Sequence, residues 1–317
     1  KEIEVQVGLF VDTDYEYVTM GLFTITDVNK NPYSSSIIGH GRVVAKTTGE
    51  FNEPQVAKTL ARVASQIGIE MGCTVSFERE SPYETLDTSL EITEPMNGLT
   101  TYQALQILAS VVGGYAVDTN DGNVKIKVFE DAWPAGSAIT PGMMTTLPEF
   151  EERDFAIYGV RCIVSEASSD EDGEIPAVGY EYIAGDIVLQ MTNKYMTQDL
   201  FDDMAERLVT YEYRPATVNM SLGDPRLEGS DTVEVEDINH NTYYVPCHMI
   251  KHIYDGGFRT EITAVKATNL ENKIGTQTPL QRMVEGISSG VVGAKAIAEK
   301  AKTIAGNTAQ YFWVTET

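Results

Sequence analysis

The sequence has few cysteines and a shortage of positive charge. Its three cysteines, Cys73, Cys162 and Cys247, are far apart and odd in number, which excludes a disulfide framework or a zinc site and indicates synthesis in a reducing compartment. Lys and Arg number 23 against 47 Asp and Glu, a formal net charge of −24 at pH 7. Such a chain repels nucleic-acid backbones and anionic lipid surfaces, so neither is an expected partner.

Apolar runs of membrane-spanning length and catalytic motifs are also missing. No run of 18 apolar residues occurs, and no secretory signal pattern opens the chain at Lys1. His-Glu-x-x-His motifs and phosphate-binding glycine loops are absent. We therefore predict no enzymatic activity, no cofactor and no catalytic or metal-binding residues.

The nearest approach to a metal site is the group Cys247, His248 and His252, with His240 nearby. In a strand, positions 248 and 252 would share a face but lie about 13 Å apart, too far for one ion. The acidic stretch 170–174 lacks the ligand alternation of an EF-hand. Structural roles are expected for both.

Alternating residues predict a β-rich start and an α+β insert. With 42% hydrophobic and 22% charged residues, the chain is of globular composition. Residues 1–50 are predicted as a partial first β-barrel domain, with a third strand that includes Arg42–Ala45. Residues 51–130 are predicted as the insert: a helix from Pro54 to Gly68, a helix with a Thr100–Gln103 capping box, and a hairpin with an Asp-Gly turn at 121–122.

Residues 131–270 are predicted to form a second β-barrel domain that contains a helix over 197–213. Within it, residues 222–267 alternate between strand patterns and turn signals, which predicts an antiparallel meander of about four strands. The predicted turn residues are Gly223, Asp224, Gly229, Asp231, Asp255, Gly256 and Gly257.

A heptad pattern follows over 278–306, before a short distal segment at 307–317. Thr278 and Pro279 are predicted to start this helix. Its apolar and small positions recur in alternating steps of four and three: Leu280, Val284, Ile287, Val291, Ala294, Ala298, Ala301 and Ala305. They predict a coiled-coil seam, or else an amphipathic helix on the protein's own surface, and the pattern alone does not choose two strands over three.

The order of these motifs resembles a known family. Gly223-Asp224-Pro225 with Asp231-x-Val233-x-Val235, then His252-x-Tyr254-Asp255-Gly256-Gly257-Phe258, is similar to the second barrel of tail-hub proteins from phages and prophages of Gram-positive hosts. Val5-x-Val7-Gly8 resembles late strands of the first barrel, and the Thr100 helix with Gly113-Gly114 resembles the insert. The early first barrel, expected before Lys1, and a distal lytic domain are not in this sequence.

The resemblance implies an α+β, β-rich fold with two barrel-like domains per subunit, arranged as a trimer with pseudo-sixfold symmetry. It implies a virion structural protein at the tail tip or baseplate, made in the bacterial cytoplasm. Expected partners are two further copies, the hexameric tail tube or distal tail ring, the tape measure protein and a distal tip or receptor-binding segment. Two alternatives stay open: the non-catalytic anchor of a tail-associated peptidoglycan hydrolase, and a carbohydrate-binding surface module.

Overall fold

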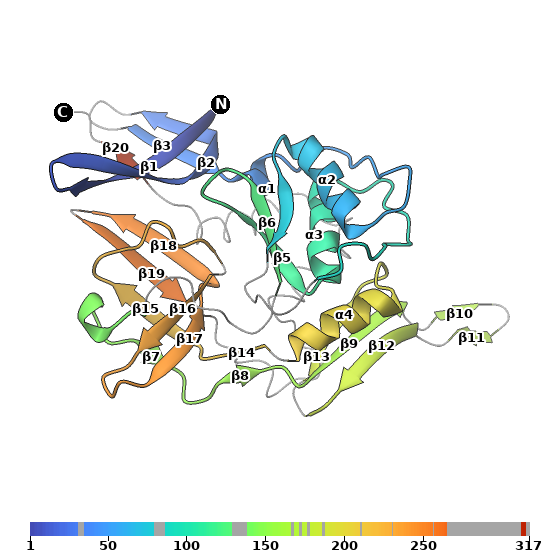
Figure 1. Cartoon of the computed structure of the whole chain (residues 1–317). Helices are drawn as coiled ribbons and strands as arrows, with labels where there is room; N and C mark the ends of the chain where they lie inside the picture. Colours follow the sequence, from blue (N-terminus) through green and yellow to red (C-terminus); the bar gives the residue numbers. More distant parts are fainter. Residues whose placement is uncertain are drawn as a thin grey trace.

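The structure is a computed structural model of the 317-residue chain. It describes residues 1–30, 35–78, 86–128, 138–165, 168–170, 173–175, 178–185, 188–209, 211–229, 231–255, 257–264 and 312–314. Figure 1 shows the elements in separate groups: the N-terminal sheet, the helical insert, a sheet with one helix packed on it, and the C-terminal strands. The fold is α+β and rich in β structure.

The N-terminal sheet has the antiparallel order β1 (Glu2–Val11), β2 (Asp14–Lys30), β3 (Ser35–His40) and β20 (Phe312–Val314). A bulge between Val5 and Gln6 lies where Gly21 takes a φ of 141°. Val7 and Met20 pack against Phe258, so this sheet is fixed to the C-terminal strands through one apolar face.

The insert contains α1 (Arg42–Ala45), α2 (Leu60–Met71), β4 (Val75–Glu78), α3 (Thr101–Val111), β5 (Gly114–Asp118) and β6 (Val124–Val128). Its sheet has the order β4-β6-β5, with β4 parallel and β5 antiparallel to β6. The structure confirms the Thr100–Gln103 capping box and the Asp121-Gly122 hairpin turn, where Gly122 has a φ of 78°.

Two predicted elements of this region are wrong. Arg42–Ala45 is a helical turn and not a strand, because the Asp118 carboxylate accepts a hydrogen bond from the Val43 amide at 3.0 Å. The helix predicted from Pro54 to Gly68 begins at Leu60 and ends at Met71. Thr59 caps its start, and the left-handed Gly72, with a φ of 67°, ends it.

The third group of elements is a sheet with α4 (Gln198–Leu208) packed on it. Its strands are β9 (Gly159–Ser165), β12 (Val178–Ile183) and β13 (Val188–Thr192), in the order β12-β9-β13. The short pairs β10 (Ser168–Asp170) with β11 (Gly173–Ile175), and β8 (Phe155–Ala156) with β14 (Glu212–Tyr213), accompany it. The helix predicted over 197–213 therefore stops at Leu208, because Glu212 and Tyr213 pair with β8.

The C-terminal strands form two sheets. One has the order β18 (Met249–Tyr254), β19 (Phe258–Thr263), β15 (Ala216–Met220) and β7 (Glu149–Phe150), and a short helix η1 (Pro141–Met143) precedes it. The other pairs β16 (Thr232–Glu236) with β17 (Thr242–Pro246). The four predicted strands of residues 222–267 are present, but as two hairpins in different sheets and not as one meander.

One buried core connects the insert with the later elements. It includes Leu105 and Leu108 of α3, Met204 of α4, Val235 of β16 and Ile262 of β19. In the described part of the chain every sheet has an open strand order, so the two barrels stay a prediction. No described helix is long and apolar enough to cross a membrane.

Candidate functional site

One of the turn residues predicted from the sequence, Asp231, takes part in a joint between the insert and the C-terminal strands. Asp231, at the end of the 223–231 loop, accepts a hydrogen bond from the Lys127 ammonium of β6 at 2.5 Å. The Lys127 side chain is only 3% exposed, and Glu228 lies 3.9 Å from the same ammonium. Because a buried charge is costly unless it is paired, this contact fixes the loop on β6.

Hydrogen bonds from both sides complete this joint. The Asn120 amide donates to Glu228 at 2.9 Å, and its side chain donates to the Pro225 carbonyl at 3.1 Å. The Asp231 carboxylate also accepts from the Glu228 amide, and the Asp231 carbonyl accepts from Cys247, both at 2.7 Å. We refer to Lys127, Asn120, Glu228 and Asp231 as the loop joint.

The remaining predicted turn residues lie along the same loop and at the next hairpin. Gly223 lies so close to β19 that a Cβ atom there would be 2.5 Å from the Thr260 hydroxyl. Hydrogen bonds from Arg226 hold the pKa of Asp224 below its usual value. A Cβ atom at Gly229 would be 3.7 Å from a methyl group of Val117, an ordinary van der Waals contact. Asp255 and Gly257 lie between the paired residues Tyr254 and Phe258, and Gly256 lies outside the described residues.

A second joint links α3 with α4. The buried Arg207 guanidinium donates to the Val112 carbonyl at the end of α3 at 2.9 Å and pairs with Asp203 at 2.5 Å. Gly113, with a φ of 66°, lies against Met204, which a Cβ atom would approach to 2.6 Å. These contacts hold the end of α3 against the side of α4, so the insert is attached to α4 as well as to the C-terminal strands.

The histidines have separate structural environments. His248 contacts the Tyr211 hydroxyl at 3.1 Å and the edge of Tyr213, and burial lowers its pKa to about 4. His252 stacks on Phe258, whereas His240 pairs with Glu236 in the exposed β16–β17 turn. In the described ranges no three His, Cys, Asp or Glu side chains converge on a possible metal position.

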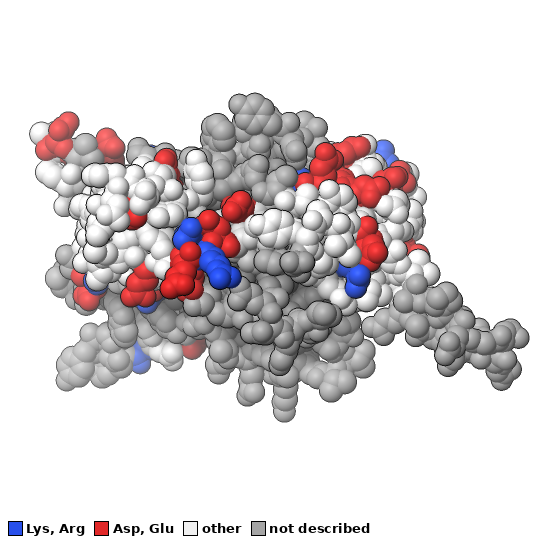
Figure 2. Space-filling model, turned by 90° about the horizontal axis from the view of Figure 1, so that it is seen from below, with Lys and Arg blue, Asp and Glu red and all other residues white. Residues whose placement is uncertain are grey.

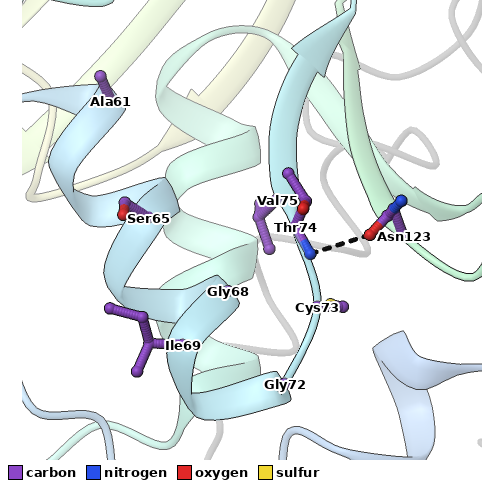
Figure 3. A pocket seen from close by; sticks show the side chains of 9 residues that line it. All are labelled: Ala61, Ser65, Gly68, Ile69, Gly72, Cys73, Thr74, Val75 and Asn123. Carbon is purple, nitrogen blue, oxygen red and sulfur yellow. Dashed lines mark hydrogen bonds between the residues drawn. The ribbon is translucent and has the colours of Figure 1, made fainter.

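A surface hollow next to α2 offers no reactive group either. It lies between the end of α2 and residues 73–75, and Figure 3 shows the Thr74 amide donating to Asn123 across it. Burial raises the pKa of the Cys73 thiol, so the neutral thiol dominates near pH 7. The hollow is therefore a groove at a helix end without an activated nucleophile.

The predicted helix seam from Leu280 to Ala305 lies outside the described residues, so it stays a prediction. Lys127 was missed in the sequence. Its signal was the pattern Val-Lys-Ile-Lys-Val in β6, which places Lys125 and Lys127 on one face. An apolar strand that pairs two lysines on one side needs carboxylates opposite them, and Glu228 and Asp231 supply these.

Comparisons with known proteins gave matches only among solved structures. No family model and no curated protein matches the sequence. One of the matching structures is a prophage tail protein, gp18 of Listeria monocytogenes, which is 13% identical with a TM-score of 0.48. The match covers 91% of this chain and 89% of gp18.

Two further solved structures are similar at the same level. A tail protein of Neisseria meningitidis is 14% identical over 81% of this chain and 84% of its own, with a TM-score of 0.48. The 43 kDa tail protein of prophage MuSo2 from Shewanella oneidensis is 14% identical over 84% of this chain and 88% of its own, with a TM-score of 0.45. The chain is thus similar to proteins described as phage tail proteins, while the host type stays a prediction.

Proposed function

We propose that this chain is a structural, non-catalytic component of a phage-type tail. In this proposal it is a homotrimeric hub at the tail tip or baseplate, with two barrel-like β units per subunit. It would adapt the hexameric tail tube or distal tail ring to a distal fibre, a receptor-binding segment or a lysin, and would meet the tape measure protein on its axis.

The observation that carries the proposal is the loop joint. The motif whose resemblance suggested a tail hub, Gly223 to Asp231, contacts Lys127 of the insert through a buried ion pair. The motif thereby connects two units of the chain and exposes no reactive group among the residues described around it. A rigid connection between units is what an adaptor that transmits load requires.

The charge of the chain supports the same role. With a net charge of −24, a ring of such subunits would present a strongly acidic lining to anything that passes through it. Figure 2 shows carboxylates in several clusters on one face, with few cations among them. DNA in transit would not adhere to such a surface, because it would release no counterions there.

The trimer rests on the heptad seam from Leu280 to Ala305 and on the resemblance. Alanines at Ala294, Ala298, Ala301 and Ala305 allow close approach of neighbouring helices. Gly286, Gly290 and Gly293 would each cost an isolated helix about 1 kcal/mol relative to Ala, so the helix needs a partner surface.

The test is to locate the chain in a particle. Particles that carry a tagged copy of this chain would be imaged by electron microscopy with gold-labelled antibody, beside untagged particles as the control. We expect label at the tail tip and three copies per particle. Label that is absent from intact particles, or distributed along the tail, would contradict the proposal.

A further inference from the structure

The turn half of the β1–β2 hairpin exposes a row of aromatic side chains. Phe10, Tyr15 and Tyr17 are 64%, 58% and 66% exposed. Phe10 pairs with Tyr15 and Gly8 pairs with Tyr17, so the three rings share one face of the ribbon. The opposite face carries Val7, which is buried against Phe258. The aromatic face is therefore outside the core, near the edge of the molecule where Figure 1 shows the turn.

The rings form a continuous surface. The Phe10 and Tyr15 ring centroids are 5.2 Å apart, and those of Tyr15 and Tyr17 are 6.3 Å apart with an interplanar angle of 31°. Tyr17 lies over the backbone of Gly8, since a Cβ atom at Gly8 would be 3.0 Å from the Tyr17 ring. Glycine supports one side of this ring at close range and leaves the other side open.

Polar side chains continue the row along the same face. The Gln6 amide and the Thr19 hydroxyl each donate to the Glu4 carboxylate at 2.9 Å. The Gln6–Thr19 pair lies two residues along the strands from the Gly8–Tyr17 pair, a distance of about 7 Å. A carboxylate, an amide and a hydroxyl thus lie next to open aromatic rings, within reach of one extended ligand.

The charge around this row restricts what can bind to it. Residues 2–29 contain six carboxylates, Glu2, Glu4, Asp12, Asp14, Glu16 and Asp27, and no Lys or Arg. Nucleic acids whose bases would stack on these rings are therefore excluded, because the carboxylates would repel the phosphates of the backbone. Anionic glycans and anionic lipids are excluded on the same ground.

We propose that this face of the β1–β2 hairpin binds a neutral oligosaccharide. The C–H faces of pyranose rings would stack on Tyr17 and Tyr15, whose negative ring faces attract the weakly positive hydrogens. Sugar hydroxyls would donate hydrogen bonds to the Glu4 carboxylate and accept them from the Gln6 amide group. With the Thr19 hydroxyl they could do either. This site does not depend on the tail role of the chain.

The test is calorimetric titration of the full chain with neutral hexasaccharides of β-1,4-linked glucose and of β-1,4-linked N-acetylglucosamine, with oligogalacturonate as the anionic probe. We expect saturable binding of at least one neutral probe and none of the anionic one. Tyr17→Ala should weaken the binding about tenfold, through loss of a stacked ring. The matched control Tyr254→Ala removes a tyrosine of similar exposure, 69%, from another strand and should change nothing.

Three results would overturn this assignment. One is the absence of saturable binding of both neutral probes to a folded chain, with folding checked by circular dichroism. Another is an equal loss of binding in Tyr17→Ala and Tyr254→Ala. The third is binding to neutral phosphatidylcholine vesicles, or self-association in sedimentation, that is lost in Tyr17→Ala while no glycan binds. Vesicle binding would assign the aromatic row to a membrane surface, and self-association would assign it to contact between copies of the chain.

Discussion

At the scale of single residues, the Lys127 ammonium is the most buried charged group of the loop joint. Its side chain is 3% exposed, and the carboxylates of Asp231 and Glu228 are 18% and 16% exposed. Removal of Lys127 leaves the Asp231 carboxylate partly buried without this cation, whereas Glu228 keeps Lys125 at 3.9 Å. The energetic consequence should therefore be far larger than for an ion pair in solvent.

We predict that Lys127→Met lowers the free energy of unfolding by about 3–5 kcal/mol, because it keeps the aliphatic stem and leaves Asp231 without its cation. Urea denaturation followed by circular dichroism measures this. Lys251→Met is the control, because Lys251 forms an exposed pair with Glu261 at 3.9 Å and should cost less than about 1 kcal/mol. Equal costs for the two variants would show that the loop joint is not a stabilising contact.

A second prediction at this scale concerns pH. Burial lowers the pKa of His248 to about 4, whereas the unfolded chain titrates near 6.5. The unfolded state binds more protons between these values, so the contribution of His248 to stability is complete above about pH 6.5. It is lost as the pH falls toward about 4.

His248→Phe keeps an aromatic ring against Tyr213 and cannot titrate. We expect this variant to lose about 1 kcal/mol at pH 7.5, with the hydrogen bond to Tyr211, and to be less sensitive than the parent between pH 6.5 and 4.5. Denaturation midpoints measured across this range check it. Parallel pH profiles of parent and variant would contradict the buried, neutral His248.

At the scale of elements, the joint between α3 and α4 allows a matched pair of substitutions. Gly113 and Gly72 have nearly equal φ angles, 66° and 67°. A Cβ atom at Gly113 would be 2.6 Å from Met204, whereas nothing lies within 4 Å of one at Gly72. Both Ala variants carry the cost of a left-handed backbone, and only one crowds a neighbouring helix.

We predict that Gly72→Ala costs about 1–2 kcal/mol and that Gly113→Ala costs a further 1–3 kcal/mol or so, because α4 must shift away from α3. Thermal and urea unfolding of both variants measure the difference. If both cost the same, the packing of α3 against Met204 does not restrain these helices.

The elements also show how far the sequence alone could lead. Local signals were sufficient for the Thr100–Gln103 capping box and the Asp121-Gly122 turn, because their hydrogen bonds join residues close in sequence. They failed at Arg42–Ala45, where the deciding acceptor, Asp118, is 75 residues away. They failed again at 209–213, where pairing with Phe155 and Ala156 ends the helix early.

The candidate site overlaps the sequence prediction at one residue, Asp231, which was predicted as a turn residue with Gly223, Asp224 and Gly229 because turn chemistry is local. Its partner Lys127 was not found, because it is 104 residues from Asp231 in the chain. The aromatic row was also missed: Phe10, Tyr15 and Tyr17 come together only through the register of the hairpin.

At the scale of the whole molecule, association of subunits has to overcome a net charge of −24 on each copy. Like charges repel less at high ionic strength, so we expect the trimer to strengthen when salt is added. In the proposed trimer, the predicted apolar seam from Leu280 to Ala305 would supply the attraction. Ile287→Asp should dissociate the trimer by placing a carboxylate in the seam, whereas Ser288→Asp, one position off it, should not.

The native mass of the full chain tests the central claim most directly. Sedimentation equilibrium would be measured from micromolar concentrations upward, at low and at moderate salt. We predict a species with three times the 34.9 kDa of one chain, which Ile287→Asp converts to a monomer. A parent chain that stays monomeric at the highest concentration and salt would contradict the homotrimeric hub.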